Sequence, residues 1–554
     1  MKFERMWMWT LLWVAAAAAS VRGQAIDVLK AVPDDADAFA VVAKLSDLDK
    51  KASALAQKLN APAVSFLDLA GKMLGIGKGV DVHGSAALAA YVGDGEAPGA
   101  MAIIPVTDYK ELLASVKAKE TEGGVSSFQI VGGKEMLVAK KGNYAFATPA
   151  QHQHLLVKVL KNDKNVTSKI SAVEGWLKTQ DFAVVVLEKT LKFGAKMAVE
   201  KIPDELPGVP EEQAKVVKAQ LDWARSFAKS AGEEMTHAAL GVRIDEALNA
   251  GATVHVGYSE KGRFAAWGKQ RTKEHPLAGL PAGPYVFAFG GMFSPDTMKS
   301  LMGFSLEASK EAYKLSDAEA KELQQTYVDM MSGMDTMSIA LRMPKQGEPL
   351  FGATVGVMRV KDSADYLKRY SESVKKLDKI MKTQGEAKPV KVAGKDAVEV
   401  TMDMKAVLQG NNDPNAEMML EKMFGSGTKM TVTMAAADPQ TVIFSYLPAS
   451  KMKGIVESFA SEKQLRTEGI NEKTLKNLVA DPFFTILWSP KETAELVRAV
   501  AKDFGQELPI PAVGQTPPIG IAGRATATTT EIQLLVPVEV IEEIGKLYQK
   551  LLTQ

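Results

Sequence analysis

Residues 39–59 read FAVVAKLSDLDKKASALAQKL, an apolar run followed by a polar turn and a segment with helical periodicity. This pattern predicts a β-strand, a turn and an amphipathic helix. Three further stretches repeat it: FAVVVLEKTLKFGAKMAVEKI at 182–202, YVFAFGGMFSPDTMKSLMGF at 285–304 and FFTILWSPKETAELVRAVAKDF at 483–504. The recurrence decides the expected fold, because repeated units of this kind bury their apolar faces against one another.

The turns of these repeats carry residues that favour the start of a helix. Ser46, Ser294 and Ser489 can accept hydrogen bonds from free amides of the first helical turn. Pro295 and Pro490 fall at the first helical position, where a missing N–H has no cost. We therefore expect the helices to begin at these turns.

Each repeat is followed by two short apolar runs joined by a loop rich in Gly, Pro, Asn or Asp, which predicts a β-hairpin. The paired runs begin at Ala86 and Met101, His237 and Ala252, Met337 and Gly352, and Gly520 and Glu531. After three of the hairpins the chain enters another helix, and Asp108 and Asp362 fall at equivalent N-cap positions.

These elements predict an α+β fold of two homologous halves. Each half would hold two strand-turn-helix plus β-hairpin modules, which form antiparallel sheets with helices mainly on one face. The expected boundaries are 26–273 for the first double module and 284–554 for the second. Residues 274–283, EHPLAGLPAG, are the expected linker, because prolines and glycines gather there between patterned segments.

The first 25 residues have the three parts of a signal peptide. Lys2 and Arg5 give a positive start, the run MWMWTLLWVAAAAA covers 6–19, and small residues follow. This run has 14 residues, whereas a membrane span needs about 20. We therefore expect cleavage after Gly23 or Ala25, rather than a retained anchor, and export to the periplasm or the extracellular space.

Composition excludes several functional classes. The chain has no cysteine, which removes thiol catalysis, Cys-ligated zinc and disulfides. Loss of residues 1–25 would remove three basic residues and one acidic residue, leaving 64 basic and 65 acidic residues. This balance gives no electrostatic reason to expect nucleic acid or an anionic membrane surface as a partner.

Four segments carry a resemblance to known sequences: 32–59, 67–92, 104–115 and 132–149. They resemble a family of exported bacterial proteins that are known from genome sequences and lack an assigned function. The resemblance covers most of the first half and only loosely the second. It implies export and an internal repeat, and it supplies no active-site residues.

No complete catalytic, cofactor or metal motif is present. The glycine-rich stretch 71–79 lacks the Ser or Thr of a phosphate loop, and the histidines of 151–154 would lie on different faces of a helix. The S-x-x-K pattern at 226–229 and 373–376 lacks its companion motifs, and 410–417 departs from the calcium-loop pattern. We therefore expect no cofactor and no bound metal.

Methionine is concentrated in the second half, where 18 of the 26 methionines lie between Met292 and Met452. Methionine fills irregular cores and also lines adaptable binding surfaces, and its thioether can bind Cu(I). Core filling is the first interpretation, a ligand site is the second and copper is the third. A ligand site would use Met298, Met302, Met330, Met331, Met334 and Met337.

The sequence therefore predicts an exported, non-catalytic binding or scaffold protein, whose partner is an unknown protein, peptide or hydrophobic ligand. One alternative is a carrier of a hydrophobic ligand or peptide through the Met-rich half. Another is an enzyme whose active site is assembled from residues scattered along the sequence. Oligomeric state does not follow from the residues.

Overall fold

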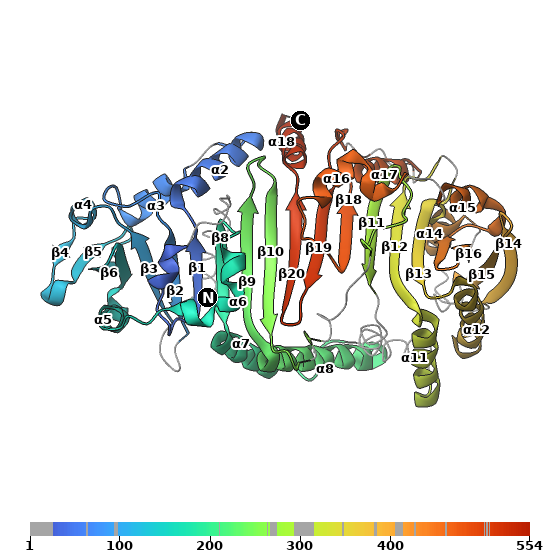
Figure 1. The fold of residues 1–554 in the computed structure, drawn as a ribbon, viewed down its shortest axis with the longest axis horizontal. Coiled ribbons are helices and arrows are strands. Elements are labelled where there is room, and N and C mark those ends of the chain that lie inside the picture. Colours follow the sequence, from blue (N-terminus) through green and yellow to red (C-terminus); the bar gives the residue numbers. More distant parts are fainter. Residues whose placement is uncertain are drawn as a thin grey trace. The chain divides into compact units, whose positions relative to one another are not determined.

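The structure, a computed structural model, describes residues 26–62, 65–92, 98–209, 211–262, 264–265, 274–292, 315–345, 348–381, 385–404, 414–425, 428–459, 463–503, 505, 508 and 510–553. The expected signal segment, 1–25, lies outside these ranges. The chain divides into two compact units, shown as a ribbon in Figure 1. Unit 1 holds residues up to 197 with 230–265 and 528–554, and unit 2 holds 198–229 and 266–527.

Unit 1 contains an antiparallel sheet with the strand order β4-β5-β6-β7-β3-β2-β1-β8-β9-β10-β20. Its strands are β1 (Ala38–Val42), β2 (Ala86–Tyr91), β3 (Gly99–Pro105), β4 (Lys119–Glu120), β5 (Ser126–Gln129), β6 (Glu135–Lys141), β7 (Tyr144–Pro149), β8 (Phe182–Leu187), β9 (Met235–Ile244), β10 (Ala250–Tyr258) and β20 (Thr529–Val536). Its helices are α2 (Leu45–Lys58), α3 (Phe66–Leu74), α4 (Tyr109–Ser115), α5 (Gln153–Lys161), α6 (Ser171–Leu177) and α18 (Val538–Thr553), with short 3-10 turns at Asp27–Lys30, Glu122–Gly124, Ala150–His152 and Val166–Lys169. The chain passes between the units within α7 (Glu188–Lys201) and α8 (Glu211–Glu234).

Unit 2 contains antiparallel strands in the order β14-β15-β16-β17-β13-β12-β11-β18-β19. Its strands are β11 (Tyr285–Met292), β12 (Met334–Arg342), β13 (Thr354–Val360), β14 (Glu386–Val392), β15 (Lys395–Asp403), β16 (Lys429–Asp438), β17 (Thr441–Ser445), β18 (Phe484–Trp488) and β19 (Ile519–Ala525). Its helices are α11 (Asp317–Met331), α12 (Ser363–Met381), α14 (Pro414–Phe424), α15 (Lys453–Phe459), α16 (Gly469–Leu475) and α17 (Pro490–Asp503), with 3-10 turns at Leu350–Ala353, Ala449–Lys451 and Leu465–Thr467.

The α+β class and the antiparallel sheets are therefore confirmed. The first repeat forms β1 and α2, and the fourth forms β18 and α17, with Pro490 at the first helical position. Asp108 accepts hydrogen bonds from two amides at the start of α4, so its predicted role as an N-cap is confirmed. The cap predicted at Ser46 is wrong, because α2 begins at Leu45, which places Ser46 within the first turn and Lys44 at the N-cap position.

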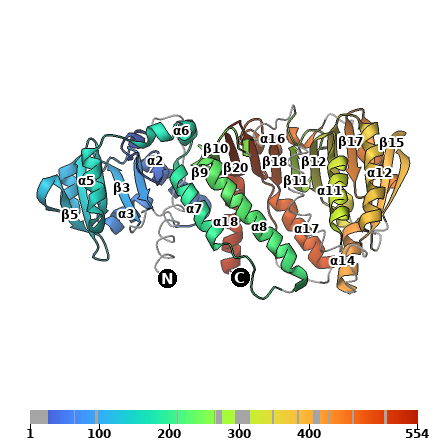
Figure 2. The ribbon, with the colours of Figure 1, turned by 90° about the horizontal axis from the view of Figure 1, so that it is seen from below.

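Helices pack on both faces of the unit 1 sheet, which differs from the one-sided arrangement that the sequence predicts. Trp176 of α6 packs over His255 on one face, whereas Leu45 and Leu48 of α2 pack over Phe182 on the other. Figure 2 shows α6 on one side of these strands, and α7 and α18 on the other. The physical reason is that the central strands are apolar at both odd and even positions, so helices can bury apolar side chains on either face.

The segment 274–283, expected as a linker, packs against the core of unit 2. Leu277 and Leu280 are fully buried there, and Ser338 donates a hydrogen bond to the Pro276 carbonyl at 2.9 Å. Arg342 donates to the carbonyls of Pro281 and Ala282 at 2.6 and 2.9 Å. The segment is thus held by both apolar and polar contacts.

Candidate functional site

An apolar row crosses six neighbouring strands of the unit 1 sheet, from β2 to β20. The cross-strand pairs join Leu88 to Ala40, Ala40 to Val184, Val184 to Leu240, Leu240 to Val254, and Val254 to Ile532, so the six side chains share one face. We call these six residues the apolar row: Leu88, Ala40, Val184, Leu240, Val254 and Ile532.

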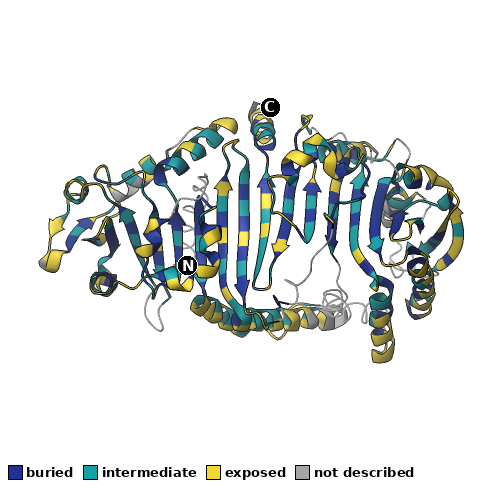
Figure 3. Cartoon of the chain, in the orientation of Figure 1, coloured by how far each residue is buried: buried dark blue, intermediate teal, exposed yellow. Residues whose placement is uncertain are grey.

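Four of the five large side chains of the apolar row are exposed, whereas Val184, like Ala40, is partly buried and packs against the core under α2. The exposed fractions are 38% for Leu88, 38% for Leu240, 43% for Val254 and 39% for Ile532. Figure 3 shows how buried residues alternate with less buried ones along these strands. The opposite face is closed, because Phe39, Ala89, Val185 and Ala239 belong to a buried core. One face of the sheet is thus packed, and the middle of the other is open to solvent.

Helices close two sides of this open face. Toward one end of the strands, Val42 and Phe182 are buried beneath Leu45 and Leu48 of α2. Beyond Leu88, the residues of β3 and β7 on this face pack against Leu112 of α4. The uncovered part of the face is therefore narrow along the strands and long across them.

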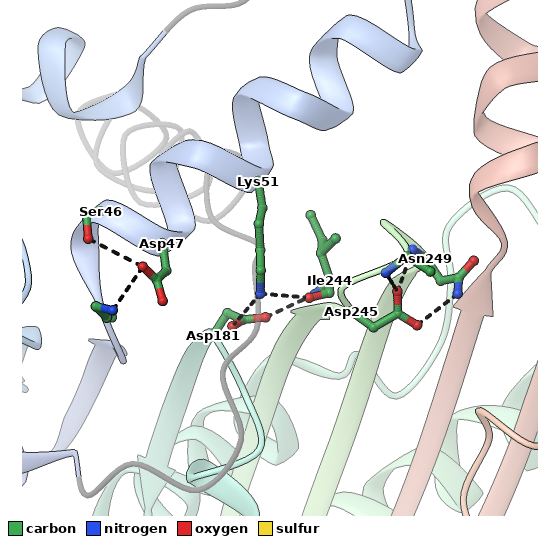
Figure 4. A network of polar contacts seen from close by, with 9 residues as sticks. Ser46, Asp47, Lys51, Asp181, Ile244, Asp245 and Asn249 are labelled. Atoms are coloured by element: carbon green, nitrogen blue, oxygen red, sulfur yellow. Dashed lines mark hydrogen bonds and ion pairs between the residues drawn. The ribbon is translucent and has the colours of Figure 1, made fainter.

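A buried ion pair lies where α2 meets the sheet (Figure 4). Asp181, just before β8, is 2% exposed, and its carboxylate lies 3.8 Å from Lys51 Nζ on α2. The same carboxylate accepts a 3.0 Å hydrogen bond from the Ile244 amide, and Lys51 donates to the Ile244 carbonyl at 3.2 Å. The network continues through Asp245 and Asn249 in the turn after β9.

The opposite end of the two central strands has a matching arrangement. Asp37, just before β1, is 5% exposed, and its carboxylate accepts from the Val92 amide at 2.6 Å and lies 3.5 Å from Lys189 Nζ on α7. The main chain also forms a hydrogen bond to the backbone carbonyl of each of these aspartates. Leu187 N donates to the Asp37 carbonyl at 3.1 Å, and Ala43 N donates to the Asp181 carbonyl at 2.9 Å. These aspartates tie α2 and α7 to the two ends of the strand pair β1–β8.

Burial raises the pKa of Asp181 to about 7, against the opposing effect of Lys51. Burial also lowers the pKa of Lys51. A raised carboxyl pKa means that the native state holds a proton that the unfolded chain releases near pH 4. The contribution of Asp181 to stability is therefore complete below about pH 4 and is lost as pH rises through about 7.

We expect Asp181→Asn to flatten this pH dependence, because the amide oxygen can still accept from Ile244 N but cannot ionise. The free energy of unfolding of the wild type should fall by as much as about 2 kcal/mol between pH 5 and pH 8 through this group alone. Urea titrations of the wild type and the variant at both pH values would measure the free energy of unfolding. An unchanged pH slope in the variant would contradict the assignment.

A pair of buried histidines lies beneath α6 on the closed face. His237 Nε2 and His255 Nδ1 are 3.1 Å apart, the two rings stack, and Trp176 lies over His255. Burial lowers the pKa of His237, which keeps this imidazole neutral near neutral pH. Because the two nitrogens point at each other, the pair is suited to packing rather than to holding one metal ion.

Ser46 and His83 form a contact that resembles part of a hydrolase site. Ser46 Oγ lies 3.1 Å from His83 Nδ1, and it also donates to Asp47 Oδ1 at 3.5 Å. In a catalytic triad the carboxylate orients the imidazole, whereas Asp47 contacts the serine. This arrangement lacks the geometry of a triad, so it does not support an enzymatic assignment.

The methionines predicted to line a ligand site are only partly described. Met298 and Met302 lie outside the described residues. The other four pack in one core of unit 2, where Met330 and Met334 are buried and Met331 and Met337 are partly buried.

The sequence alone did not identify the apolar row. Its only signal is the run of aliphatic residues at alternate positions of strands far apart in the chain.

No protein-family model, curated protein or solved structure matches the chain. Within the described ranges, no helix has the combination of length and apolarity that a membrane span requires. In the same part of the chain, no three His, Asp or Glu side chains gather as a metal site would need.

Proposed function

We propose that this protein is an exported, non-catalytic binding protein that holds an apolar ligand or partner on the apolar row of unit 1. One observation carries the proposal: four large aliphatic side chains in the middle of a sheet are each more than a third exposed. Contiguous apolar surface of this kind marks interaction sites in soluble proteins. Export rests on the signal peptide that the sequence predicts.

The middle of this face is left uncovered, while the opposite face is packed. Covering apolar surface is favourable by roughly 25 cal/mol for each Å² removed from water. A ligand that covers the row would gain this free energy without reorganising the sheet, because the strands beneath it are already paired. The four described methionines of unit 2 contribute to a packed core instead, which favours placing the ligand in unit 1.

We expect the full chain to bind the apolar dye Nile red, and Leu240→Asp with Val254→Asp to weaken binding at least tenfold, about 1.4 kcal/mol. Two carboxylates in the middle of the row would make its desolvation unfavourable. Fluorescence titration would measure the affinity. Val131→Asp is the matched control, because Val131 is 74% exposed in a turn away from the row. Equal loss in the control, or no dye binding to the wild type, would refute the proposal.

We also propose that the chain contains two copies of a double module. The strand order β4-β5-β6-β7-β3-β2-β1-β8-β9 of unit 1 corresponds to β14-β15-β16-β17-β13-β12-β11-β18-β19 of unit 2, strand for strand. The reciprocal main-chain bonds of β1 and β8 also have counterparts. Ser489 N donates to the Val286 carbonyl, and Met292 N donates to the Phe483 carbonyl. Aspartates stand directly before β1 and β8, whereas Pro284 and Phe483 stand directly before β11 and β18, so the two copies would differ at these positions.

A further inference from the structure

We infer that the ligand of the apolar row is a single long acyl chain, that of a fatty acid, lying across the strands. This inference rests on the proposed function and specifies its ligand. It is supported by the pairing of the strands, the chemistry of the side chains and the dimensions of the exposed surface.

Five of the six strands beneath the row have no free hydrogen-bonding edge. Strands β2, β1, β8, β9 and β10 each pair with a neighbour on both sides. A peptide therefore cannot bind there by adding a strand. Laid flat on the row, it would leave amide and carbonyl groups against aliphatic side chains without partners, which is costly. A hydrocarbon chain has no such groups.

The two buried carboxylates near the row already have ion-pair and hydrogen-bond partners. At the α2 side, Asp181 is bound by Lys51 and the Ile244 amide, and at the α7 side Asp37 is bound by Lys189 and the Val92 amide. The flanking positions on the same face are aliphatic or small, as the pairs Ala38–Val186 and Ala252–Leu534 illustrate. An uncharged aliphatic segment of a ligand is therefore complementary to this uncharged aliphatic surface.

The length and width of the exposed row match those of one acyl chain. Five strand spacings separate Leu88 from Ile532, or about 24 Å at about 4.8 Å each. This exceeds the about 15 Å that an acyl chain spans in half of a bilayer core. On the α2 side, the exposed band is closed over β1 and β8, where Val42 and Phe182 are buried. The large exposed side chains form one row with a single flanking residue, Leu534, so the surface suits one chain rather than a pair.

A second copy of the protein is a poorer occupant. The large exposed side chains here are those of the row together with Leu534, which is 37% exposed. Together they expose roughly 350 Å², less than half of the about 800 Å² that each partner of a stable protein interface buries. The area is too small for a dimer and sufficient for an acyl chain.

The test is displacement of Nile red from the full chain by octanoate, dodecanoate and palmitate below their micellar concentrations. We expect affinity to rise at least a hundredfold from octanoate to palmitate. A capped nine-residue peptide of alternating Leu and Val should displace the dye at least a hundredfold more weakly than palmitate. The 16-carbon lysophosphatidylcholine should displace the dye at least tenfold more weakly than palmitate, because the row offers its larger zwitterionic head group no polar partner.

A variant that shortens the row provides the internal control. Ala40→Phe would fill the space between Leu88 and Val184 and leave three strand spacings, about 14 Å, from Val184 to Ile532. We expect it to lose the gain in affinity from dodecanoate to palmitate that the wild type shows. Circular dichroism would check its fold.

The outcomes separate the two proposals. If Nile red binds and the peptide displaces it better than palmitate, or if affinity does not depend on chain length, the acyl-chain inference fails and the binding function stands. Displacement by the lysolipid but not by palmitate would overturn the choice of a fatty acid. If the wild type binds neither the dye nor any chain, the proposed function itself fails.

Discussion

Phe39→Ala should destabilise unit 1 by about 3–5 kcal/mol, the cost of removing a phenyl ring from a packed core. Phe39 is 1% exposed and lies between Ala89 and Val185 on the closed face of the sheet. Its ring belongs to the largest core of unit 1, and the rigid strands on either side cannot close around the cavity. Hydrogen exchange of peptides from β1 and β8 would measure the loss locally.

Leu88→Ala is the matched control for this prediction. Leu88 lies on the adjacent strand but on the opposite, open face, where it is 38% exposed. We expect its truncation to cost no more than about 1 kcal/mol. Equal effects of the two substitutions would mean that the face described as open is covered in solution, and would contradict the site as well as the core.

The fold class follows from the sequence because its signals are local. Phe39 begins an apolar run that ends at a turn before a helical pattern, and such periodicity is read within about 15 residues. Asp108 is similar, since an N-cap depends on the residues that follow it. Strand order is different, because β1 pairs with β8 across more than 140 residues and nothing near Phe39 specifies that partner.

The apolar row could not be predicted for the same reason. Leu240 and Val254 belong to one expected hairpin, so their proximity was predictable. Val184 and Ile532 come from distant segments, and an aliphatic residue in a strand has the same sequence pattern whether its face is covered or open. Exposure depends on where the helices pack, and here α2 covers one end of the strands only.

The segment 274–283 shows how composition can mislead. Its prolines and glycines are typical of a linker, and that is how the sequence describes it. In the structure the segment packs closely against β11, where a glycine of the strand leaves room for its backbone. A Cβ at Gly290 would meet the Pro276 carbonyl oxygen at 2.2 Å.

Gly290→Ala should therefore destabilise unit 2 by about 3–5 kcal/mol. The added methyl would also lie 2.5 Å from the Pro276 carbonyl carbon and 3.0 Å from the Leu277 amide nitrogen, and backbone atoms cannot rotate away as a side chain can. Relief requires the segment to lift from the sheet. Lifting exposes Leu277 and Leu280, each worth about 1.5–3 kcal/mol when buried.

Limited proteolysis of 274–283 and hydrogen exchange of β11 would detect the lifted segment, and urea titration would give the change in stability. Gly454→Ala is the control, because a Cβ at Gly454 in α15 meets nothing within 4 Å. Alanine favours helix over glycine by up to about 1 kcal/mol, so this variant should be neutral or slightly more stable. If Gly290→Ala is equally neutral, the segment does not pack on β11 in solution and behaves as the linker that its composition indicates.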